Sequence, residues 1–353
     1  NLAMPMQCEK KIMSKQIDTI DEKSLADYLE RDMAGFYGPV TAKKFSNGQS
    51  NPTFLLSAKS GRYVLRRKPP GVLLPSAHAV DREYRVLKAL AHTDVPVAQA
   101  FHLCEDDAII GSMFYVMSYE QGKVYWDPSL PEFSKADRGA VYDEIIRVMA
   151  ALHSVDISAA GLTDYGKSGN YFERQINRWT KQYRASETEA IPAMDRLIDG
   201  LNTKLPDDNS PSCLIHGDYR LDNLMLGEND TRIIAVLDWE LSTLGNPLAD
   251  LAYFCMGLRL PKTAHSNGLA GIDRSELGIP SEEAIVAQYC QFRGVEKIDH
   301  WNFYLAFSYF RLAAIAQGVY KRSLTGNASN KNAAKLGEMV HVLATMAIEL
   351  IED

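Results

Sequence analysis

The sequence predicts an α+β protein with two lobes: a small antiparallel β-sheet lobe with one helix between its strands, in residues 1–121, and a larger, mainly helical lobe in residues 122–353. Two observations predict this division. Short β-type segments separated by turn residues fill the middle of the smaller lobe, whereas long segments of helical periodicity follow Gln121-Gly122. We therefore place the boundary between the lobes at this glycine-containing dipeptide.

The smaller lobe is predicted from short apolar strands that alternate with turns. A helix with acidic residues in its first turn precedes the first strand, and small-residue turns separate the first three strands. A helix with apolar residues on one face and two further strands complete the lobe. The predicted elements are a helix at Asp21–Met33, strands at Val40–Phe45, Thr53–Ser57 and Tyr63–Arg66, a helix at His78–Leu90, and strands at Phe101–Leu103 and Met113–Tyr119.

The larger lobe is predicted to be helical, with two β segments inside it. Aromatic residues of its tail fall at several helical phases, which predicts a helix buried on most sides rather than an aromatic ligand site. The predicted elements are helices at Lys135–Ser154, Tyr171–Ala185 and Ile191–Asn202, β segments at Leu214–His216 and Ile233–Leu237, and a helical tail from Ser281 to Glu352.

Composition and charge exclude several classes of function. The 353 residues are 46% hydrophobic and 24% charged, and the net charge of -7 argues against a sequence-independent nucleic-acid binder, which needs a basic face. No apolar run reaches the roughly 18 residues of a membrane span, and Asn1–Lys15 lacks the apolar core of a signal peptide. The five cysteines form no C-x-x-C pair, so reduced thiols and a cytoplasmic location are expected.

The segment Leu214–Leu226 carries the pattern that points to chemistry. It reads Leu-Ile-His-Gly-Asp-Tyr-Arg-Leu-Asp-Asn-Leu-Met-Leu, so apolar runs on both sides would hold a polar loop between two buried strands. The side chains of Asp218 and Asn223 can then point into one cleft. In phosphoryl transfer, a carboxylate in the first position orients the attacking hydroxyl and accepts its proton, and a carboxamide oxygen in the second holds Mg²⁺.

A second carboxylate follows a nearly continuous apolar segment. Asp238 comes directly after Ile233–Leu237, where a buried carboxylate is costly unless a cation or hydrogen-bond donors compensate it. A Mg²⁺ that bridges two phosphates is such a cation. The pattern H-x-D-x-x-x-x-N, followed by an apolar run and Asp, matches the catalytic loop and metal loop of a kinase. We therefore predict a protein-kinase-like bilobal fold, with an ordinary polar turn capped by Asp218 as the alternative.

Three features upstream agree with a nucleotide site. Ser46-Asn47-Gly48 lies in the turn between the first two strands, where a phosphate-covering loop is expected, although a plain hairpin turn has the same composition. Arg66 ends the third strand, in the place of the V-A-I-K lysine, as a cation for the α- and β-phosphates. Glu83 on the following helix would pair with it. The alternatives are a solvent-facing charge at Arg66, with Lys68 in its role, and an ordinary surface glutamate at position 83.

Further nucleotide contacts are assigned to the end of the smaller lobe. The last strand of this lobe leads directly to the boundary dipeptide Gln121-Gly122. The residues assigned to the nucleotide site there are Met117, Ser118, Tyr119 and Glu120.

Three more residues have predicted roles around the polar loop. Arg220, two residues after Asp218, is predicted to neutralise charge that develops on the transferred phosphoryl group. The alternative for Arg220 is a structural ion pair with Asp222 or Asp250. His216 is expected to pack and hydrogen-bond so that it shapes the loop. Asp250 is expected near the start of a helix, where it tethers the amides of the catalytic loop.

The sequence resembles the aminoglycoside phosphotransferase/choline kinase-like family over most of its length. More closely, it is similar to a subgroup of kinase-like domains that occur alone in bacteria and fused to certain acyl-CoA dehydrogenases in animals. The family blocks are His216-Gly217-Asp218 with Asn223, Leu237-Asp238-Trp239-Glu240, and Gly245–Ala252; the subgroup blocks are Tyr63–Gly71, His216–Asn223, Trp301–Phe307 and Gln317–Arg322.

The resemblance implies a kinase fold, ATP as the phosphate donor (GTP in some members), and two Mg²⁺ ions held by Asn223 and Asp238. For the subgroup it implies phosphorylation of hydroxyacyl-CoA compounds. One departure is arginine rather than lysine at position 66. Arginine does not present a compact point charge, so nucleotide affinity or geometry is expected to differ from that of lysine-bearing relatives.

The expected acceptor is a small molecule with a hydroxyl group, and its identity stays open. A polycationic aminoglycoside needs an acidic pocket, but acidic and basic residues are equal in number from Gly257 to Asp353. Arg311, Lys321 and Arg322 are candidates for contact with an anionic CoA thioester, or are solvated helix surface. We therefore expect a metabolite kinase without a nucleic-acid or membrane partner. An aminoglycoside O-phosphotransferase and a catalytically idle pseudokinase are the alternatives.

Overall fold

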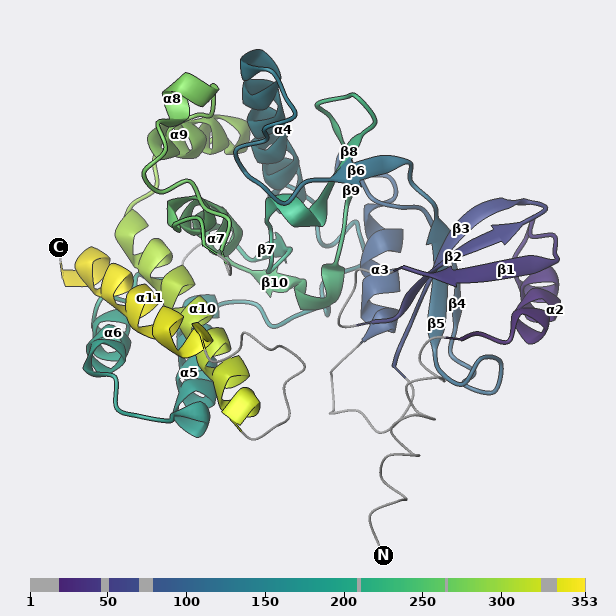
Figure 1. The fold of residues 1–353 in the computed structure, drawn as a ribbon, viewed down its shortest axis with the longest axis horizontal. Coiled ribbons are helices and arrows are strands. Elements are labelled where there is room, and N and C mark those ends of the chain that lie inside the picture. Colours follow the sequence, from purple (N-terminus) through teal and green to yellow (C-terminus); the bar gives the residue numbers. More distant parts are fainter. Residues whose placement is uncertain are drawn as a thin grey trace, which may run out of the picture. The chain divides into compact units, whose positions relative to one another are not determined.

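The structure is a computed structural model that describes residues 19–45, 51–69, 79–207, 211–263, 266–324 and 335–352. Its chain divides into two units. The N-terminal unit runs to Gly122 and includes Ile234–Glu240, and the C-terminal unit comprises Lys123–Ile233 and Leu241–Asp353. An antiparallel sheet in the first unit and a set of helices in the second confirm the predicted α+β class (Figure 1).

The N-terminal unit is built on a five-stranded antiparallel sheet in the order β1-β2-β3-β5-β4. In this register Arg66 on β3 lies opposite Thr53 on one neighbouring strand and Tyr115 on the other. The Arg66 backbone is therefore fixed by two partners. The elements are α2 (Glu22–Asp32), β1 (Val40–Lys44), β2 (Thr53–Ala58), β3 (Gly61–Arg67), α3 (Val80–Leu90), β4 (Ala100–Cys104) and β5 (Phe114–Ser118).

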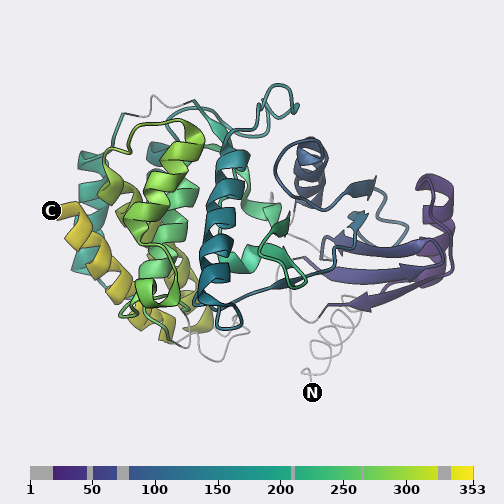
Figure 2. The same ribbon diagram turned by 90° about the horizontal axis from the view of Figure 1, so that it is seen from above.

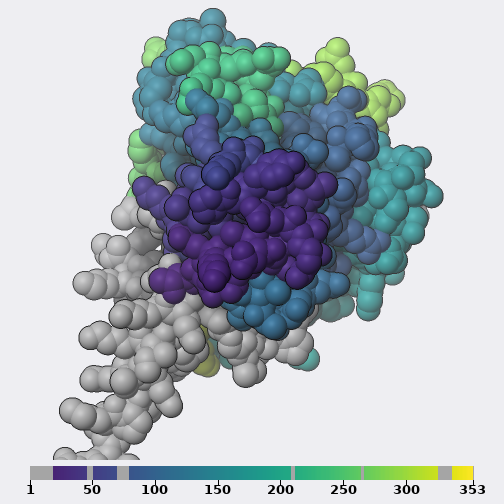
Figure 3. All heavy atoms as spheres, turned by 90° about the vertical axis from the view of Figure 1, so that its right-hand side faces the viewer, coloured from purple at the N-terminus to yellow at the C-terminus, as the bar shows by residue number. Residues whose placement is uncertain are grey.

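Helix α2 covers one part of this sheet because its apolar side chains repeat at helical spacing. Asp21 caps the helix by accepting bonds from the amides of Lys23 and Ser24. Leu25 and Leu29 then point into a core shared with β-sheet residues such as Phe54. Figure 3 faces this unit and shows α2 and the first strands, in purple, as one continuous surface.

The C-terminal unit is an assembly of helices around α10, the longest of the described helices. Helix α10 contacts α5, α6, α7 and α11, and Figure 2 shows these helices, teal to yellow, packed together. Five of its seven aromatic side chains are buried, as the spread of helical phases predicts, and Trp301 and Tyr320 are half-buried. The helices are α4 (Lys135–His153), α5 (Tyr171–Ser186), α6 (Pro192–Thr203), α7 (Leu248–Arg259), α8 (Arg274–Leu277), α9 (Glu282–Arg293), α10 (Trp301–Leu324) and α11 (Lys335–Glu352).

Short strands frame the polar loop of this unit. They form a two-stranded antiparallel sheet, β10-β7, and a three-stranded sheet in the order β6-β8-β9. Two of them, β6 and β10, are not predicted from the sequence, because each is three residues long, contains a glycine and lacks the apolar run that predicts β7. The strands are β6 (Gly122–Val124), β7 (Cys213–Ile215), β8 (Leu224–Gly227), β9 (Ile233–Val236) and β10 (Thr243–Gly245), with the 3₁₀ turns η1 (Leu221–Asn223) and η2 (Trp239–Leu241) between them.

Candidate active site

Arg66, Glu83 and Asp238 form one charged cluster in the N-terminal unit. Arg66 Nε lies 2.8 Å from Glu83 Oε2, and Arg66 Nη2 lies 2.7 Å from Asp238 Oδ1. Asn51 donates to Glu83 Oε1 at 2.8 Å, and the Tyr115 hydroxyl donates to Oε2 at 3.1 Å. Both carboxylate oxygens of Glu83 are therefore bound, and the pairing of Arg66 with Glu83 that the sequence suggested is present.

Burial governs the ionisation of this cluster. Glu83 is 1% exposed, and desolvation raises its pKa to about 7, because the attraction to Arg66 offsets the loss of water only in part. Burial alone would lower the pKa of Arg66. The attraction of Glu83 and the other negative groups is stronger than this effect, so the pKa of Arg66 is raised. Arg66 is thus a permanent cation held among carboxylates.

Asp238 presents a carboxylate at the end of β9 in a strained backbone conformation. Its φ is +61°, in the left-handed region that costs a non-glycine residue about 1–2 kcal/mol. The amide of Val236, two residues earlier, donates to the carbonyl of Pro96 at 2.8 Å and fixes the preceding strand. Oδ1 of Asp238 binds Arg66, while Oδ2 has no partner among the residues that the structure describes. One oxygen is therefore available to a ligand.

The other residues assigned to the nucleotide site lie apart from this cluster or outside the described chain. Ser46-Asn47-Gly48 falls in a segment outside the described residues. Lys68 lies 3.9 Å from Asp81 and not in the Arg66 cluster. The remaining four residues are half-buried at the end of β5 and just beyond it, where Ser118 is hydrogen-bonded to Glu120 and Arg62 stacks on the Tyr119 ring at 4.4 Å; they are Met117, Ser118, Tyr119 and Glu120.

The polar loop after β7 in the C-terminal unit is held by Asp250 of α7. Asp250 Oδ2 accepts from the His216 amide at 2.7 Å, and Oδ1 accepts from the Gly217 amide at 2.8 Å. Gly217 has a φ of +82°, and a Cβ there would lie 2.6 Å from the Leu241 carbonyl oxygen, so only glycine fits. His216 is fully buried, and its Nδ1 accepts from the Asp218 amide at 3.2 Å. Asp250 and His216 therefore shape the loop as the sequence predicts.

A buried histidine completes the network around Asp250. His153 Nε2 lies 3.2 Å from Asp250 Oδ2, and its Nδ1 lies 2.7 Å from the Tyr289 hydroxyl. Burial lowers the pKa of His153 more than Asp250 raises it, so the imidazole is neutral. Burial raises the pKa of Tyr289, so its hydroxyl donates to Nδ1, and the Nε2 proton points to Asp250. Burial acts to raise the pKa of Asp250, but bonds from His153 and His216 lower it.

Asp218 and Asn223 are brought together by this loop and η1. Asn223 Nδ2 donates to the Asp218 carbonyl oxygen at 2.8 Å and to its Oδ2 at 3.1 Å. Both bonds use the amide nitrogen, so the amide oxygen of Asn223 has no partner among the described residues. The five-residue spacing therefore delivers a carboxylate beside a carboxamide whose oxygen is available.

Arg220 forms ion pairs with two carboxylates of the same loop, those of Asp218 and Asp222. Its Nη2 lies 2.7 Å from Asp222 Oδ2, and its Nε lies 3.5 Å from Asp218 Oδ2. The pair with Asp222 is the one that the sequence analysis kept as an alternative. Because the Arg220 side chain is 49% exposed, the same guanidinium remains accessible from solvent beside Asp218.

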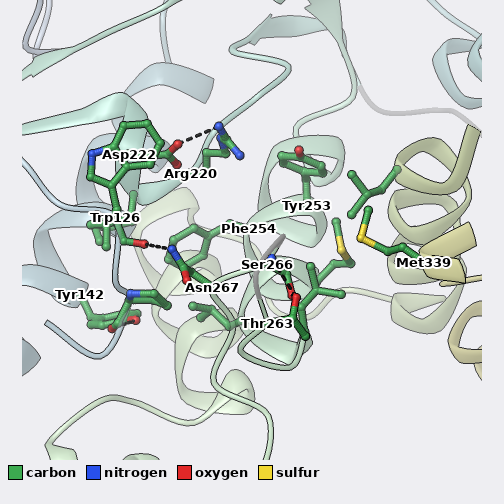
Figure 4. Close-up of a pocket in the computed structure, with 18 residues that line it drawn as sticks. Trp126, Tyr142, Arg220, Asp222, Tyr253, Phe254, Thr263, Ser266, Asn267 and Met339 are labelled. Carbon is green, nitrogen blue, oxygen red and sulfur yellow. Dashed lines mark hydrogen bonds and ion pairs between the residues drawn. The ribbon is translucent and has the colours of Figure 1, made fainter. Parts of the chain in front are cut away.

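A pocket of about 350 Å³ opens next to this loop, entirely within the C-terminal unit. Figure 4 shows Arg220 and Asp222 at one end, Trp126 bonded through its carbonyl to Asn267, and Met339 of α11 at the other end. Its walls are mainly aromatic and aliphatic. Asp222 is the single carboxylate among the described residues that line it, and it is paired with Arg220. The pocket therefore suits a largely apolar molecule.

The sequence did not predict that two further residues, Tyr253 and Arg311, lie near the polar loop. Tyr253 of α7 lines the pocket, and the guanidinium of Arg311 lies 5.2 Å from the centre of its ring. Arg311 of α10 is 6% exposed and donates through Nη2 to the Gly217 carbonyl oxygen at 2.5 Å. A tyrosine three residues after Asp250 was a weak signal for the first, because helical residues three apart share a face.

The described residues contain no group of three or more His, Cys, Asp or Glu side chains that could hold a metal. Within the same part of the chain, no helix has the length and apolarity needed to cross a membrane.

An antiparallel sheet with an Arg–Glu ion pair, together with a helical unit that carries the His-Gly-Asp loop, defines a protein of the kinase-like fold class. Comparison with known proteins places it more closely: a model of the phosphotransferase enzyme family matches residues 41–282. The chain belongs to this family. The predicted enzyme class, a phosphotransferase, is thereby confirmed at the level of the family.

Individual relatives agree with this membership. The chain is 48% identical to mouse acyl-CoA dehydrogenase family member 10 over 327 residues, which is 91% of this chain but 30% of that protein. A solved Ralstonia eutropha structure, provisionally described as an aminoglycoside phosphotransferase, has a TM-score of 0.88 and 48% identity, and the match covers 95% of this chain and 99% of that one. The predicted resemblance to the family and to its dehydrogenase-linked subgroup is confirmed.

A more distant structure confirms the fold alone. It is a thermostable mutant of aminoglycoside phosphotransferase APH(4)-Ia, in ternary complex with AMP-PNP and hygromycin B. The TM-score is 0.60 at 14% identity, and the match covers 93% of this chain and 98% of that one. The chain spans less than half the length of the curated relatives it matches, between 30% and 43% of those proteins.

Proposed function

We propose that the chain transfers the γ-phosphate of Mg·ATP to a hydroxyl group of a small, largely apolar metabolite, with hydroxyacyl-CoA compounds as the candidate class. The observation that carries this proposal is the loop that joins Asp218 to Asn223 beside a pocket of about 350 Å³. Arg220 lines the pocket, and its Nε lies 3.5 Å from Asp218 Oδ2, so a molecule in the pocket lies close to this carboxylate.

In the proposed reaction, Asp218 orients the acceptor hydroxyl and accepts its proton. A bond forms between the acceptor oxygen and the γ-phosphorus, the bond from that phosphorus to the bridging oxygen breaks, and ADP leaves. Arg220 lies beside Asp218 and is proposed to stabilise the charge on the transferred group, after exchange of its contact with Asp222. Arg66, held by Glu83, is the proposed cation for the α- and β-phosphates.

The residues of the chain fit magnesium. The amide oxygen of Asn223 and Oδ2 of Asp238 are hard oxygen atoms without partners among the described residues. Mg²⁺ takes one or two protein oxygens and completes its shell with phosphates and water. Bound there, it would neutralise phosphate charge. We therefore propose Asn223 and Asp238 as its ligands, and ATP as the nucleotide, with GTP to be tested beside it.

The walls of the pocket favour an acyl acceptor over an aminoglycoside. A polycation would need several unpaired carboxylates, whereas the one carboxylate among the described lining residues is paired with Arg220. Met339 and Leu312 instead offer aliphatic surface, and burying an acyl chain against such surface yields about 0.8 kcal/mol for each CH₂ group.

A screen of acceptors tests the proposal. Consumption of ATP is measured with hydroxyacyl-CoAs of different chain length, kanamycin-type aminoglycosides, choline and homoserine, with Asp218→Asn as the matched inactive control. Turnover with hydroxyacyl-CoA that disappears in the control supports the proposal. Turnover confined to the amines would contradict the proposed substrate class. Mg·ATP binding without turnover on any acceptor would favour the pseudokinase alternative.

A further inference from the structure

Trp126 is an exposed aromatic side chain where the pocket meets solvent. It lines the pocket and is 59% exposed, more than any other aromatic residue that the structure describes in the C-terminal unit. Figure 4 shows it at the end of the pocket that holds Arg220 and Asp222, away from Met339. Tryptophan is highly buried on average, so an indole left in water beside a pocket is a contact surface for a ligand.

The backbone that carries this indole is held by side chains from a distant part of the chain. Asn267 Nδ2 donates to the carbonyl oxygen of Trp126 at 3.1 Å. Lys262 Nζ lies 2.7 Å from Oδ2 of the next residue, Asp127, whose Oδ1 accepts from the hydroxyl of Ser129 at 2.7 Å. These bonds fix the backbone on which the indole is presented.

Asn267 adds a hydrogen-bond acceptor to the opening of the pocket. Only the nitrogen of its amide can donate to the carbonyl of Trp126, so the amide oxygen is left for another partner. This Oδ1 has no partner among the residues that the structure describes. Because Asn267 lines the same pocket as Trp126, the opening presents a flat apolar face together with an oxygen that accepts from an N–H group.

The charges around the opening are already paired. Arg220 and Asp222 are the charged side chains among the described lining residues, and their atoms Nη2 and Oδ2 lie 2.7 Å apart. Lys262 is likewise paired with Asp127. A phosphate or an ammonium group would have to break one of these pairs to bind here, whereas a neutral chain would not. The opening therefore suits an uncharged part of a substrate that carries apolar groups and N–H donors.

We propose that Trp126 and Asn267 bind the pantetheine arm of a hydroxyacyl-CoA acceptor. If the acceptor hydroxyl lies near Asp218 and the acyl chain extends toward Met339, the other side of the thioester leaves the pocket past Trp126 (Figure 4). The pantetheine arm is uncharged, with geminal methyl groups that suit the indole face and amide N–H groups that suit Oδ1 of Asn267. This inference rests on the proposed function and adds the residues that recognise the thioester side of the substrate.

The test compares three thioesters that share one hydroxyacyl chain, those of CoA, pantetheine and N-acetylcysteamine. The last of these lacks the geminal methyl groups. KM is measured at saturating Mg·ATP, and Kd is measured by calorimetry. Trp126→Ala should raise both constants about tenfold for the CoA and pantetheine thioesters, the usual worth of a small apolar contact in a pocket, and less than about twofold for the N-acetylcysteamine thioester. The kcat should stay unchanged, because the loop that carries Asp218 is untouched.

Two further variants sharpen the comparison. Asn267→Ala should also weaken the CoA and pantetheine thioesters, and its effect should not add to that of Trp126→Ala, because Asn267 holds the backbone of Trp126. Phe292→Ala is the matched control. It removes an aromatic side chain of α9 that is 47% exposed and is not among the residues that line the pocket, so all the constants should stay at their native values.

Two results would overturn the pantetheine site. An equal rise for all three thioesters in Trp126→Ala would mean that the indole contacts the acyl chain, and unchanged constants for the CoA thioester would mean that the arm leaves the pocket elsewhere. Failure of the proposed function has a different signature. The thioesters would then bind the native chain, and bind Trp126→Ala more weakly, without transfer of phosphate. Absence of binding by every thioester would refute both.

Discussion

Arg66 on β3 and Glu83 on α3 form a buried ion pair, with Arg66 Nε 2.8 Å from Glu83 Oε2. The strand and the helix are thus joined by charge at the point where Asp238 also reaches Arg66. Removal of one member of a buried pair leaves the other without compensation, and this is costly.

Glu83→Ala should lower the free energy of unfolding by about 3 kcal/mol, the usual cost of breaking a buried pair. Denaturant unfolding monitored by circular dichroism measures the loss. Asp32→Ala is the control, because Asp32 pairs with Arg31 at the surface and its removal should leave the midpoint unchanged. Equal stability of Glu83→Ala and the native chain would show that the pair contributes nothing to the fold.

Acid should destabilise the C-terminal unit through His153. Burial holds the pKa of His153 in the folded chain below its usual 6.5, so the unfolded chain binds more protons as the pH falls. The stability that this histidine contributes is present above about pH 6.5 and is lost as the pH falls through the folded pKa. Asp250, whose folded pKa is also lowered, acts in the same direction at lower pH.

His153→Gln isolates this contribution. Its melting temperature should fall less steeply than that of the native chain between about pH 6.5 and 5. The comparison with the variant is needed because Glu83 acts with the opposite sign. Its folded pKa of about 7 lies above the usual 4.5 of a glutamate, so its contribution to stability falls as the pH rises through that range. Parallel pH curves for the two proteins would contradict a neutral, buried His153.

Asp238→Asn should bind Mg·ATP more weakly without losing the fold. The carboxamide oxygen still accepts the bond from Arg66 that Oδ1 now accepts at 2.7 Å, but it is a poorer magnesium ligand than a carboxylate. The rise in melting temperature with Mg·ATP should be much smaller than in the native chain. Addition of EDTA should abolish the rise in the native chain. A rise of full size in the variant would exclude Asp238 as a ligand.

Met339→Trp should restrict the acceptor rather than the nucleotide. Met339 lies at the end of the pocket away from Arg220 and Asp222, so a larger side chain there shortens the space for an acyl chain (Figure 4). We expect the KM for long-chain hydroxyacyl-CoA to rise at least about tenfold, while short chains and the Mg·ATP shift stay unchanged. An equal effect on all chain lengths would show that the acyl chain binds elsewhere.

The sequence predicts the parts of the site that depend on local spacing. Asp218 and Asn223 lie five positions apart in one loop, and buried strands flank it, so their proximity follows from the pattern alone. The pairing of Arg66 with Glu83 follows from the order of strand and helix. The tether from Asp250 also has a local signal, because a carboxylate in the first turn of a helix is free to accept amides from a neighbouring loop.

Residues brought in from distant helices could not be predicted in the same way. Arg311 reaches Gly217 across 94 positions of the chain, and on a helix with aromatic residues at every phase nothing distinguishes the side that meets the loop. The pocket likewise combines Trp126, Asn267 and Met339 from three separate segments. Such contacts are set by how helices pack, which one sequence does not encode as a local pattern.

Single-turnover phosphoryl transfer in Asp218→Asn tests the proposed role of Asp218 most directly. The variant should show the same thermal shift with Mg·ATP as the native chain, yet transfer phosphate to its acceptor about 10²–10⁴-fold more slowly, the usual size of a general-base contribution. Transfer at the native rate would contradict this role, because the loop that Asp250 holds would then contain no catalytic group.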